Sequence, residues 1–417
     1  MKASVIIPVW NGREYLPACL DALLAQDYPD FEVIVVDNAS VDGSADLVAE
    51  RYPQVRLIRN AQNLGFAGGC NIGLKTAHGD IFILLNEDTV VQPGWLQALV
   101  KALQRPEVGV VGCKILYPDG KTIQHAGGWI EWPLGLAHHY GQGEEDKGQW
   151  DEPRQVEYVT GAAMAFRRDV LERVGPLDEE FWPAYFEDVD FCFRVREAGF
   201  EVWYMPEAVV LHKGTVTLTE PAQHSSAYQR GRLRFVLKHL PPDRFLKEFV
   251  LAEKDYQRLA LLSHESGALQ GAYIEAIATG ALLLHRRWLA DQKVIQEVLL
   301  ALEELYRQAW LEDIGKGLTL PGSMLVFATS QMQPLGFPSL KEYQFHSAVP
   351  VLGPLIARFR SLWYSVAARW AIRDLIRQQE AINRQQEMHL RYLIEITIIM
   401  AHRIADLSLQ IDSPKGE

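Results

Sequence analysis

The sequence has few cysteines and no long apolar run, and both scarcities exclude classes of protein. Its 417 residues include four cysteines, none of which belongs to a C-x-x-C pair. This spacing argues against a disulfide framework or a zinc site and favours buried, reduced thiols. No uninterrupted apolar stretch reaches the roughly 18 residues that a spanning helix needs. Because the segment from Met1 to Ser4 runs straight into a strand-like pattern without signal-peptide features, we expect a cytoplasmic protein.

Positive charge is also in short supply. The 53 acidic residues outnumber the 41 basic ones, and the net charge of −12 argues against a nucleic-acid partner. Neither G-x-G-x-x-G nor G-x-x-x-x-G-K-[ST] occurs, which disfavours dinucleotide oxidoreductases and P-loop NTPases. What remains is a globular composition, 48% hydrophobic, and a length that favours two domains or one large domain with an appendage.

The first half of the sequence alternates buried strands with helices. Continuous apolar runs of strand length alternate with segments of helical apolar spacing, a pattern typical of parallel strands with helices on both faces. We therefore expect an α/β fold with an open, doubly wound sheet, whose ligands bind outside the carboxyl ends of the strands. Gly199 is the expected left-handed cap of the last helix. The expected strands are residues 5–9, 32–36, 55–59, 81–85, 108–111, 158–166 and 201–205, and the expected helices are residues 13–26, 43–52, 69–77, 93–103, 168–174 and 188–199.

The pattern divides the chain into four segments. Residues 1–221 carry the expected sheet, and within them residues 127–157 read as a long irregular loop. Residues 222–314 are expected to be helical, and residues 315–354 to form a Pro- and Gly-rich linker. Residues 355–417 are expected to form a long amphipathic helix with coiled-coil spacing and flanking arginines. For this helix we keep three alternatives: a homo-oligomer, packing within the chain, and docking on an anionic membrane surface.

An acidic cluster follows one of the buried strands. Asn86, Glu87 and Asp88 come directly after the strand at residues 81–85. Carboxylates at that edge of a sheet suit a hard divalent cation together with a diphosphate. A solvated or structural turn would show the same residues, so the cluster alone does not decide between the two interpretations.

A second acidic cluster opens a later helix. Glu187, Asp188 and Asp190 follow a run of aromatic residues. Acids in the first turn of a helix favour its dipole and can simply cap it. A carboxylate against apolar walls can also have its pKa raised and act as a general base. His212, after the last strand, is either a structural residue or an imidazole ligand of a cation held by Asp88.

Polar residues near other strand ends complete the candidates. Asp37 and Asn38 end the strand at residues 32–36, where they would face a nucleobase and a ribose. Asn63, Phe66 and Asn71 belong to a glycine-rich segment whose backbone can approach a ligand closely. Ordinary turn and cap chemistry is the alternative for this segment.

Taken in order, these segments resemble the family 2 glycosyltransferases, inverting enzymes with the nucleotide-binding α/β fold called GT-A. The resemblance covers about residues 4–215. The combination of N-x-G-F with L-L-N-x-D is most similar to the rhamnosyltransferase branch, which builds bacterial cell-surface polysaccharides. The blocks that carry the resemblance are SVIIPVWNGREYLPACLDALLAQ, EVIVVDNASVDGS, NLGFAGGCNIG, GDIFILLNEDTVV, VTGAAMAFRRDVLERVGPLDEEFW, FEDVDFCFRVREAGF and VVLHKG.

The resemblance implies roles for the matching residues. Asp188 matches the second acid of the family's E-D motif, the general base. Asp88 matches the last acid of its D-x-D motif and, with His212, is expected to bind Mn²⁺ or Mg²⁺. Asn86 replaces the first acid of that motif, so the cation has fewer carboxylate ligands. The expected donor-binding residues are Pro8, Asn11, Asp37, Asn38, Asn63, Phe66, Asn71, Asn86 and Glu87, and the expected acceptor-binding residues are Gly161, Glu187 and Asp190.

The implied function is metal-dependent transfer of a sugar, with rhamnose as one candidate. The donor would be a nucleoside-diphosphate sugar, dTDP- or UDP-linked, and the acceptor a glycan or a lipid-linked glycan. A lipid-linked acceptor would favour peripheral contact with the inner face of the cell membrane. The alternative is a catalytically silent sugar-nucleotide-binding or scaffold module of a polysaccharide assembly complex, which Asn86 in place of an acid favours.

Overall fold

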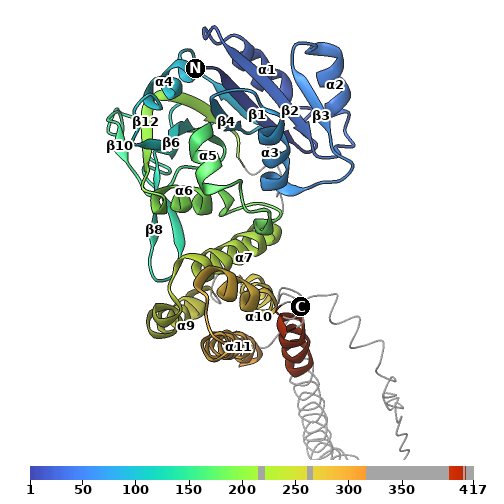
Figure 1. Ribbon diagram of the computed structural model, residues 1–417, viewed down its shortest axis with the longest axis vertical. Helices are drawn as coiled ribbons and strands as arrows, with labels where there is room; N and C mark the ends of the chain where they lie inside the picture. Colours follow the sequence, from blue (N-terminus) through green and yellow to red (C-terminus); the bar gives the residue numbers. More distant parts are fainter. Residues whose placement is uncertain (215–220, 261–265, 316–393, 407–408, 410–417) are drawn as a thin grey trace, which may run out of the picture. The chain divides into compact units, whose positions relative to one another are not determined.

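A computed structural model describes residues 1–214, 221–260, 266–315, 394–406 and 409, and their dominant feature is a mixed sheet of ten strands (Figure 1). Its strands are β1 (Ala3–Val9), β2 (Phe31–Asp37), β3 (Arg56–Arg59), β4 (Ile81–Leu85), β5 (Thr89–Val91), β6 (Val108–Leu116), β7 (Ile123–His125), β10 (Arg154–Gln155), β11 (Ala163–Arg167) and β12 (Glu201–His212). The main path runs β10-β12-β6-β11-β4-β1-β2-β3, while β5 pairs with β12 and β7 with β6.

The centre of the sheet is parallel except at one strand. β1 pairs in parallel with β2 and with β4, and the pairs β2–β3 and β6–β12 are also parallel. β11 instead runs antiparallel between β4 and β6, so the expectation of purely parallel pairing is wrong there. All five residues of β11 are buried, and a fully buried strand shows the same sequence pattern in either direction.

Helices cover both faces of the sheet, which confirms the predicted doubly wound α/β class. Alternate residues of a strand point to opposite faces: Val5 and Ile7 of β1 belong to one core and Ile6 to the other. The predicted cap, Gly199, has a φ of +90°. The first core also holds residues of α1 (Leu16–Leu24), α2 (Ser44–Arg51) and α4 (Trp95–Ala102), and the second holds residues of α3 (Gly65–Thr76), α5 (Arg168–Val174), the 3₁₀ turn η1 (Glu179–Phe181) and α6 (Glu187–Glu197).

The expected irregular loop at residues 127–157 contains strands. β8 (Gly128–Glu131) and β9 (Leu136–His139) form a separate antiparallel hairpin, and β10 joins the main sheet. The fully buried guanidinium of Arg232 donates a hydrogen bond to the carbonyl oxygen of Leu134 in the hairpin turn, at 2.8 Å. Strands of two to four residues are too short for a recognisable alternation, which explains the wrong prediction.

Helices follow the sheet in the described residues: α7 (Pro221–His239), α8 (Pro242–Arg244), the π-helical turn η2 (Phe245–Phe249), α9 (Val250–Ala260), α10 (Ser266–Trp288) and α11 (Gln292–Gly315). By their contacts, the described residues up to Ala309 and from Ala401 onward belong to one unit, and those between Trp310 and Met400 to another. Residues 394–406 are helical. Nearly all of the predicted linker and most of the predicted C-terminal helix lie outside the described residues, so the coiled coil stays a prediction.

Among the described helices, one is long and apolar enough to cross a membrane by length and composition. The stretch is Gly267–Trp288 of α10, and 56% of its most apolar window is buried. α10 packs along α7, and Glu275 pairs with Arg230 of α7. Because Glu275 and several small residues interrupt the apolar pattern, a search for continuous apolar runs does not find this helix. Its contacts are those of a core helix.

Candidate active site

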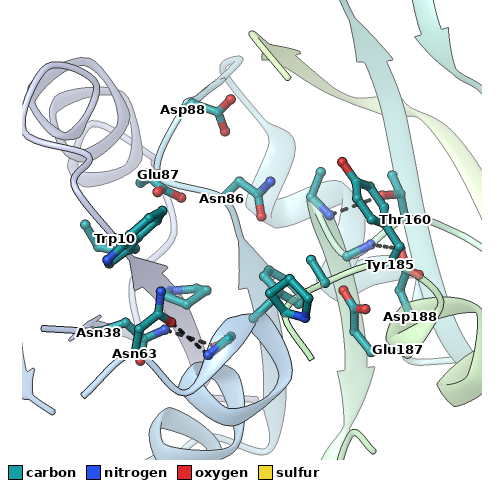
Figure 2. Close-up of a pocket in the computed structure, with 18 of the residues that line it drawn as sticks. Trp10, Asn38, Asn63, Asn86, Glu87, Asp88, Thr160, Tyr185, Glu187 and Asp188 are labelled. Atoms are coloured by element: carbon teal, nitrogen blue, oxygen red, sulfur yellow. Dashed lines mark hydrogen bonds between the residues drawn. The ribbon is translucent and has the colours of Figure 1, made fainter. Parts of the chain in front are cut away.

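The carboxyl ends of β1, β2 and β4 meet at one edge of the sheet, beside a pocket with a cavity volume of about 200 Å³. In Figure 2, Asn86 and Asp88 lie on one side of this pocket and Glu187 and Asp188 on the opposite side. The residues that line the pocket are Pro8, Val9, Trp10, Asn38, Asn63, Gly65, Phe66, Asn86, Glu87, Asp88, Thr160, Gly161, Ala162, Pro183, Ala184, Tyr185, Glu187, Asp188 and His212.

Strand pairing brings Asp88 and His212 together from distant parts of the chain. β5 and β12 are antiparallel, and His212 stands opposite Thr89, the residue after Asp88. Nε2 of His212 lies 3.2 Å from Oδ1 of Asp88, and Oδ2 of Asp88 accepts a hydrogen bond from N of Gly214 at 2.9 Å. Burial raises the pKa of Asp88, but these contacts outweigh burial and hold the pKa below its usual value. Asp88 is therefore ionised at neutral pH.

The groups around His212 fit a divalent cation. Nδ1 of His212 lies 2.6 Å from Oε1 of Gln124, an acceptor, so Nδ1 carries a proton. Nε2 is then the nitrogen that would offer a lone pair to a cation, and it lies 3.2 Å from Oδ1 of Asp88, close enough for both atoms to bind the same ion. Oδ1 of Asn86 is buried without a hydrogen-bond partner. The described residues contain no group of three His, Cys, Asp or Glu side chains arranged for a metal; Nδ2 of Asn86 lies 3.3 Å from Nε2 of His212, so Asn86 would be a third ligand with its amide turned to bring Oδ1 there.

A strained backbone delivers Glu187 and Asp188 to the opposite side of the pocket. Tyr185 and Phe186 precede α6 with φ of +80° and +73°, a left-handed conformation that costs of order 1–3 kcal/mol at a non-glycine residue. α7 packs closely on this segment, since a Cβ at Gly231 would lie 2.7 Å from the carbonyl oxygen of Tyr185. The turn and its support by α7 fix where the two acids begin the helix.

Two backbone amides orient the carboxylate of Asp188. Oδ2 accepts a hydrogen bond from N of Gly161 at 2.8 Å, and Oδ1 accepts one from N of Val189 at 2.8 Å. Gly161 can approach because it lacks a side chain: a Cβ there would lie 2.9 Å from the ring of Phe66. The backbone of Gly161, just before the start of β11, therefore holds the carboxylate of Asp188 at the pocket.

The two neighbouring acids differ in how far their surroundings raise the pKa. Burial and the charge of Asp188 raise the pKa of Glu187 well above its ordinary value, and Oε2 of Glu187 has no hydrogen-bond partner. Burial also raises the pKa of Asp188, but the N–H groups of Gly161 and Val189 oppose the increase. Neighbouring carboxyls whose pKa values are pushed apart divide the roles of acid and base. Because the rise is opposed at Asp188 and not comparably at Glu187, Asp188 gives up its proton more readily and is the better base.

Glu87 also lines the pocket but is neutral at pH 7. Burial, followed by the charge of Asp88, raises its pKa to about 8. A Cβ at Gly12 would lie 2.7 Å from Cγ of Glu87, so the loop after β1 closes over this side chain. Glu87 therefore adds no negative charge at neutral pH to the side of the pocket that holds Asp88.

The predicted donor-binding residues Pro8, Asn38, Asn63 and Phe66 line the pocket, with Asn86 and Glu87. Both polar atoms of the Asn38 side chain are hydrogen-bonded to neighbouring residues. Nδ2 donates to the carbonyl oxygen of Gly65 at 3.0 Å, and Oδ1 accepts from Nδ2 of Asn60 at 2.8 Å. Asn38 therefore shapes this side of the pocket.

Three other predicted donor-binding residues do not line the pocket. Asn71 is buried and exchanges hydrogen bonds with the backbone of Leu177 at 2.9 and 3.1 Å, so its side chain is already hydrogen-bonded within the protein. Asn11 accepts a hydrogen bond from a backbone N–H of the β2–α2 loop at 2.9 Å, and Asp37 is buried at the end of β2. Both lie in strand-end segments next to lining residues, and their roles stay predictions.

Asp190 does not line the pocket, and its predicted contact with the acceptor stays a prediction. Its side chain is fully buried, with Oδ2 accepting from Nε of Arg194 at 2.8 Å and Oδ1 lying 2.8 Å from Nζ of Lys238. His239 approaches Oδ1 at 2.9 Å. Burial raises the pKa of Asp190, but these partners outweigh burial and lower it strongly. Because Lys238 and His239 belong to α7, Asp190 fastens the helix of the two acids to α7.

The prediction from sequence missed Trp10, Thr160 and Tyr185, which line the pocket, and Gln124, which orients His212. Trp10 directly follows β1, so the rule that ligands lie at carboxyl strand ends could have found it. Gln124 gave no such signal, because its place depends on the pairing of the three-residue strand β7 with β6.

Comparison with known proteins identifies the family. Residues 4–175 match the family model described as Glycosyl transferase family 2. Over 262 residues the chain is 31% identical to N-acetylglucosaminyl-diphospho-decaprenol L-rhamnosyltransferase of Mycobacterium tuberculosis, a match that covers 56% of the chain and 83% of that protein. The chain belongs to glycosyltransferase family 2, which confirms the resemblance and the expected GT-A fold.

The chain is also similar to a second curated protein and to a solved structure, over different shares of each protein. The chain is 34% identical over 220 residues to the O-antigen biosynthesis protein RfbC of Myxococcus xanthus, a match that covers 51% of the chain and 17% of that protein. It spans a quarter or less of the length of the first two curated relatives that it matches. The solved mannosyltransferase PcManGT of Pyrobaculum calidifontis, in complex with GDP-Man and Mn²⁺, aligns with a TM-score of 0.42 at 21% identity, covering 76% of the chain and 88% of that protein.

Proposed function

We propose that the chain transfers a sugar from a nucleoside-diphosphate donor to a hydroxyl of a glycan or lipid-linked acceptor, with inversion at the anomeric carbon. The observation that carries the proposal is the opposition of two functional groups across one pocket. Asp88 lies on one side and the carboxylate of Asp188 on the other (Figure 2), and His212 contacts Asp88 at 3.2 Å. Direct displacement needs this arrangement, because the base and the leaving group act on opposite faces of the reacting carbon.

In the proposed mechanism Asp188 accepts the proton of the acceptor hydroxyl as its oxygen attacks the sugar. Its carboxylate is aimed by N of Gly161 and N of Val189, so little reorganisation is needed at the moment of transfer. Burial and the charge of Asp188 raise the pKa of Glu187, which favours a neutral carboxyl beside the base. Asn63 and Phe66 contribute to the wall that receives the donor.

Asp88, His212 and Asn86 are the residues that would hold a divalent cation, Mn²⁺ or Mg²⁺. When bound, such a cation supplies positive charge that stabilises the departing diphosphate. Asp88 provides an ionised oxygen, His212 a lone pair on Nε2, and Asn86 a buried oxygen without a partner. Oxygen ligands with one imidazole suit Mn²⁺ well.

Gln124→Ala should weaken metal binding without touching a metal ligand. The variant removes the acceptor that holds the proton on Nδ1 of His212, and loss of such an orienting partner costs about 10- to 100-fold in metal affinity. The measurement is the Mn²⁺ concentration that half-saturates the thermal stabilisation of the protein. Gln149→Ala, in an exposed segment, is the control. Equal Mn²⁺ requirements for wild type and Gln124→Ala would contradict this placement of the metal.

The rate of sugar transfer should depend on the ionisation of Asp188. Because the pKa of Asp188 is raised, its carboxylate gains a proton as the pH falls through that raised value, and the transfer rate falls with it. The acid limb of the kcat profile, recorded at saturating metal, is expected above about 4, the usual pKa of an aspartate. An acid limb at or below this value would argue against Asp188 as the base.

A panel of UDP-, dTDP- and GDP-sugars, assayed with Mn²⁺ or Mg²⁺, tests the proposed function. The expected result is metal-stimulated release of one nucleoside diphosphate, increased by a suitable acceptor and abolished by EDTA. Asn86 in place of an acid favours the second candidate, a catalytically silent sugar-nucleotide-binding module. Such a module would be stabilised by a nucleotide sugar in a thermal-shift assay but would release no nucleoside diphosphate.

The relatives suggest a biological setting for the transfer. The names of the rhamnosyltransferase and the O-antigen biosynthesis protein support rhamnose as one donor sugar and a surface polysaccharide as one product. A decaprenyl-linked acceptor, as the name of the first of these proteins describes, would place the reaction on the cytoplasmic face of the membrane. Self-association through the C-terminal helix and peripheral membrane contact stay part of the proposal.

A further inference from the structure

The charges that line the pocket are unsuited to a diphosphate. The lining residues include four carboxyl groups, from Glu87, Asp88, Glu187 and Asp188, and none of the lining residues is a lysine or an arginine. Even with Glu87 and Glu187 protonated, the other two carboxylates repel an incoming nucleoside diphosphate. A single divalent cation leaves much of this negative charge uncompensated, so a cationic side chain is expected near the mouth of the pocket.

Lys213 occupies such a position. It follows His212 directly, and its backbone N donates a hydrogen bond to the carbonyl oxygen of Asp88 at 3.2 Å. Its Nζ donates to the hydroxyl of Tyr15 at 2.8 Å and lies 4.3 Å from the centre of that ring. Tyr15 belongs to the same loop after β1 as Trp10, which lines the pocket. The side chain of Lys213 therefore spans the two strand-end segments beside Asp88.

The partners of the Lys213 ammonium are neutral. Among the described residues, no carboxylate lies within ion-pair distance of Nζ, and the side chain is exposed. Arg13, a second cation of the same loop, is already committed, because its guanidinium donates to the carbonyl oxygens of Asp42 and Gly43 at 3.4 and 3.2 Å. An ammonium bound to a phenol can exchange that partner for an anion at little cost, since a hydrogen bond between two charged groups is the stronger one.

We propose that Lys213 is a diphosphate-binding residue that leaves Tyr15 when a donor enters and pairs with the phosphate oxygens. The inference rests on the proposed function and names a residue that this function does not include. The backbone of Lys213 stays fixed to Asp88, while its flexible four-carbon stem lets the ammonium move as a point charge. The same contact would favour departure of the nucleoside diphosphate during transfer.

Isothermal titration of inorganic pyrophosphate, UDP, dTDP, GDP and uridine in Mg²⁺ buffer tests the assignment. Lys213→Ala is expected to weaken the binding of pyrophosphate and of the preferred nucleoside diphosphate about 10- to 100-fold, the scale of a hydrogen bond to a charged group. Lys213→Arg should retain most of the affinity, and uridine should bind wild type and Lys213→Ala alike. Lys121→Ala, at an exposed lysine of the β6–β7 turn, controls for net charge.

Tyr15→Phe separates the proposal from a structural role. If Lys213 only ties two loops together, Tyr15→Phe and Lys213→Ala break the same contact and weaken pyrophosphate binding equally, which would overturn the proposal. If Lys213 binds the diphosphate, Tyr15→Phe leaves the affinity within about twofold of wild type. Unchanged affinity in Lys213→Ala would also overturn it, while the proposed function would stand. Wild type that binds neither pyrophosphate nor any nucleoside diphosphate would defeat the proposed function, and this inference with it.

Discussion

Asp188→Asn should lower the rate of sugar transfer about 10²- to 10⁴-fold, the usual contribution of a general base. The amide occupies the same space but cannot accept the proton of the acceptor hydroxyl. Donor affinity should change little, because the Asp88–His212 pair lies on the other side of the pocket. Single-turnover transfer rates and donor affinities, measured on the same preparations, separate the two effects.

Glu187→Gln is the matched control for this prediction. Because the raised pKa of Glu187 favours its protonated form, the substitution exchanges one neutral group for another, and the rate should fall far less than in Asp188→Asn. If Glu187→Gln lowered the transfer rate more than Asp188→Asn did, Glu187 would be the base, which would contradict the roles proposed for the two acids. Equal small losses in both would show that neither carboxyl takes the proton.

Asp190→Asn should destabilise the protein by about 3 kcal/mol or more, the usual cost of removing one partner from a buried ion pair. The side chain of Asp190 is fully buried, and the substitution leaves Arg194, Lys238 and His239 facing a neutral group. Chemical denaturation of the two proteins measures the difference. Asp46→Asn is the control, because its exposed pair with Arg59 contributes no more than about 1 kcal/mol.

The stabilisation by Asp190 has a defined pH dependence. Because the folded-state pKa of Asp190 is lowered, its contribution is fully present above the ordinary pKa of an aspartate and is lost as the pH falls toward the lowered value. The gap in unfolding free energy between wild type and Asp190→Asn should therefore be constant near neutral pH and should narrow only in strong acid. A gap that widens below about pH 4 would contradict the ion-pair network.

The alternating apolar runs predicted the framework of the fold and the edge of the sheet where the site lies. β1, β2 and β4 are continuous buried strands, so their carboxyl ends and the residues that follow them, such as Asn86 and Asp88, could be placed together. The antiparallel insertion of β11 could not be predicted. The apolar pattern of a buried strand does not show whether the strand runs parallel or antiparallel to its neighbours. The pairing of β11 depends on β4 and β6, which are distant in the sequence.

The same limit explains why two of the predicted site residues do not line the pocket. Asp190 and Asn71 have the composition of site residues, but α7 and the segment before η1 take up their polar groups. Those partners lie far along the chain, and no local spacing reveals them. Gln124 was missed for the converse reason, since its contact with His212 exists only because β7 pairs with β6. The motifs indicated which end of the sheet carries the site, whereas tertiary contacts determine which side chains line the pocket.

We propose that Asp88 and His212 hold a metal in the pocket that Asp188 faces. Electron paramagnetic resonance titration of Mn²⁺, in the presence of the preferred nucleoside diphosphate, measures this directly in wild type, Asp88→Asn and Asp188→Asn. We expect binding at least tenfold weaker in Asp88→Asn and nearly unchanged in Asp188→Asn. Equal Mn²⁺ binding in wild type and in Asp88→Asn would locate the metal elsewhere and contradict the account.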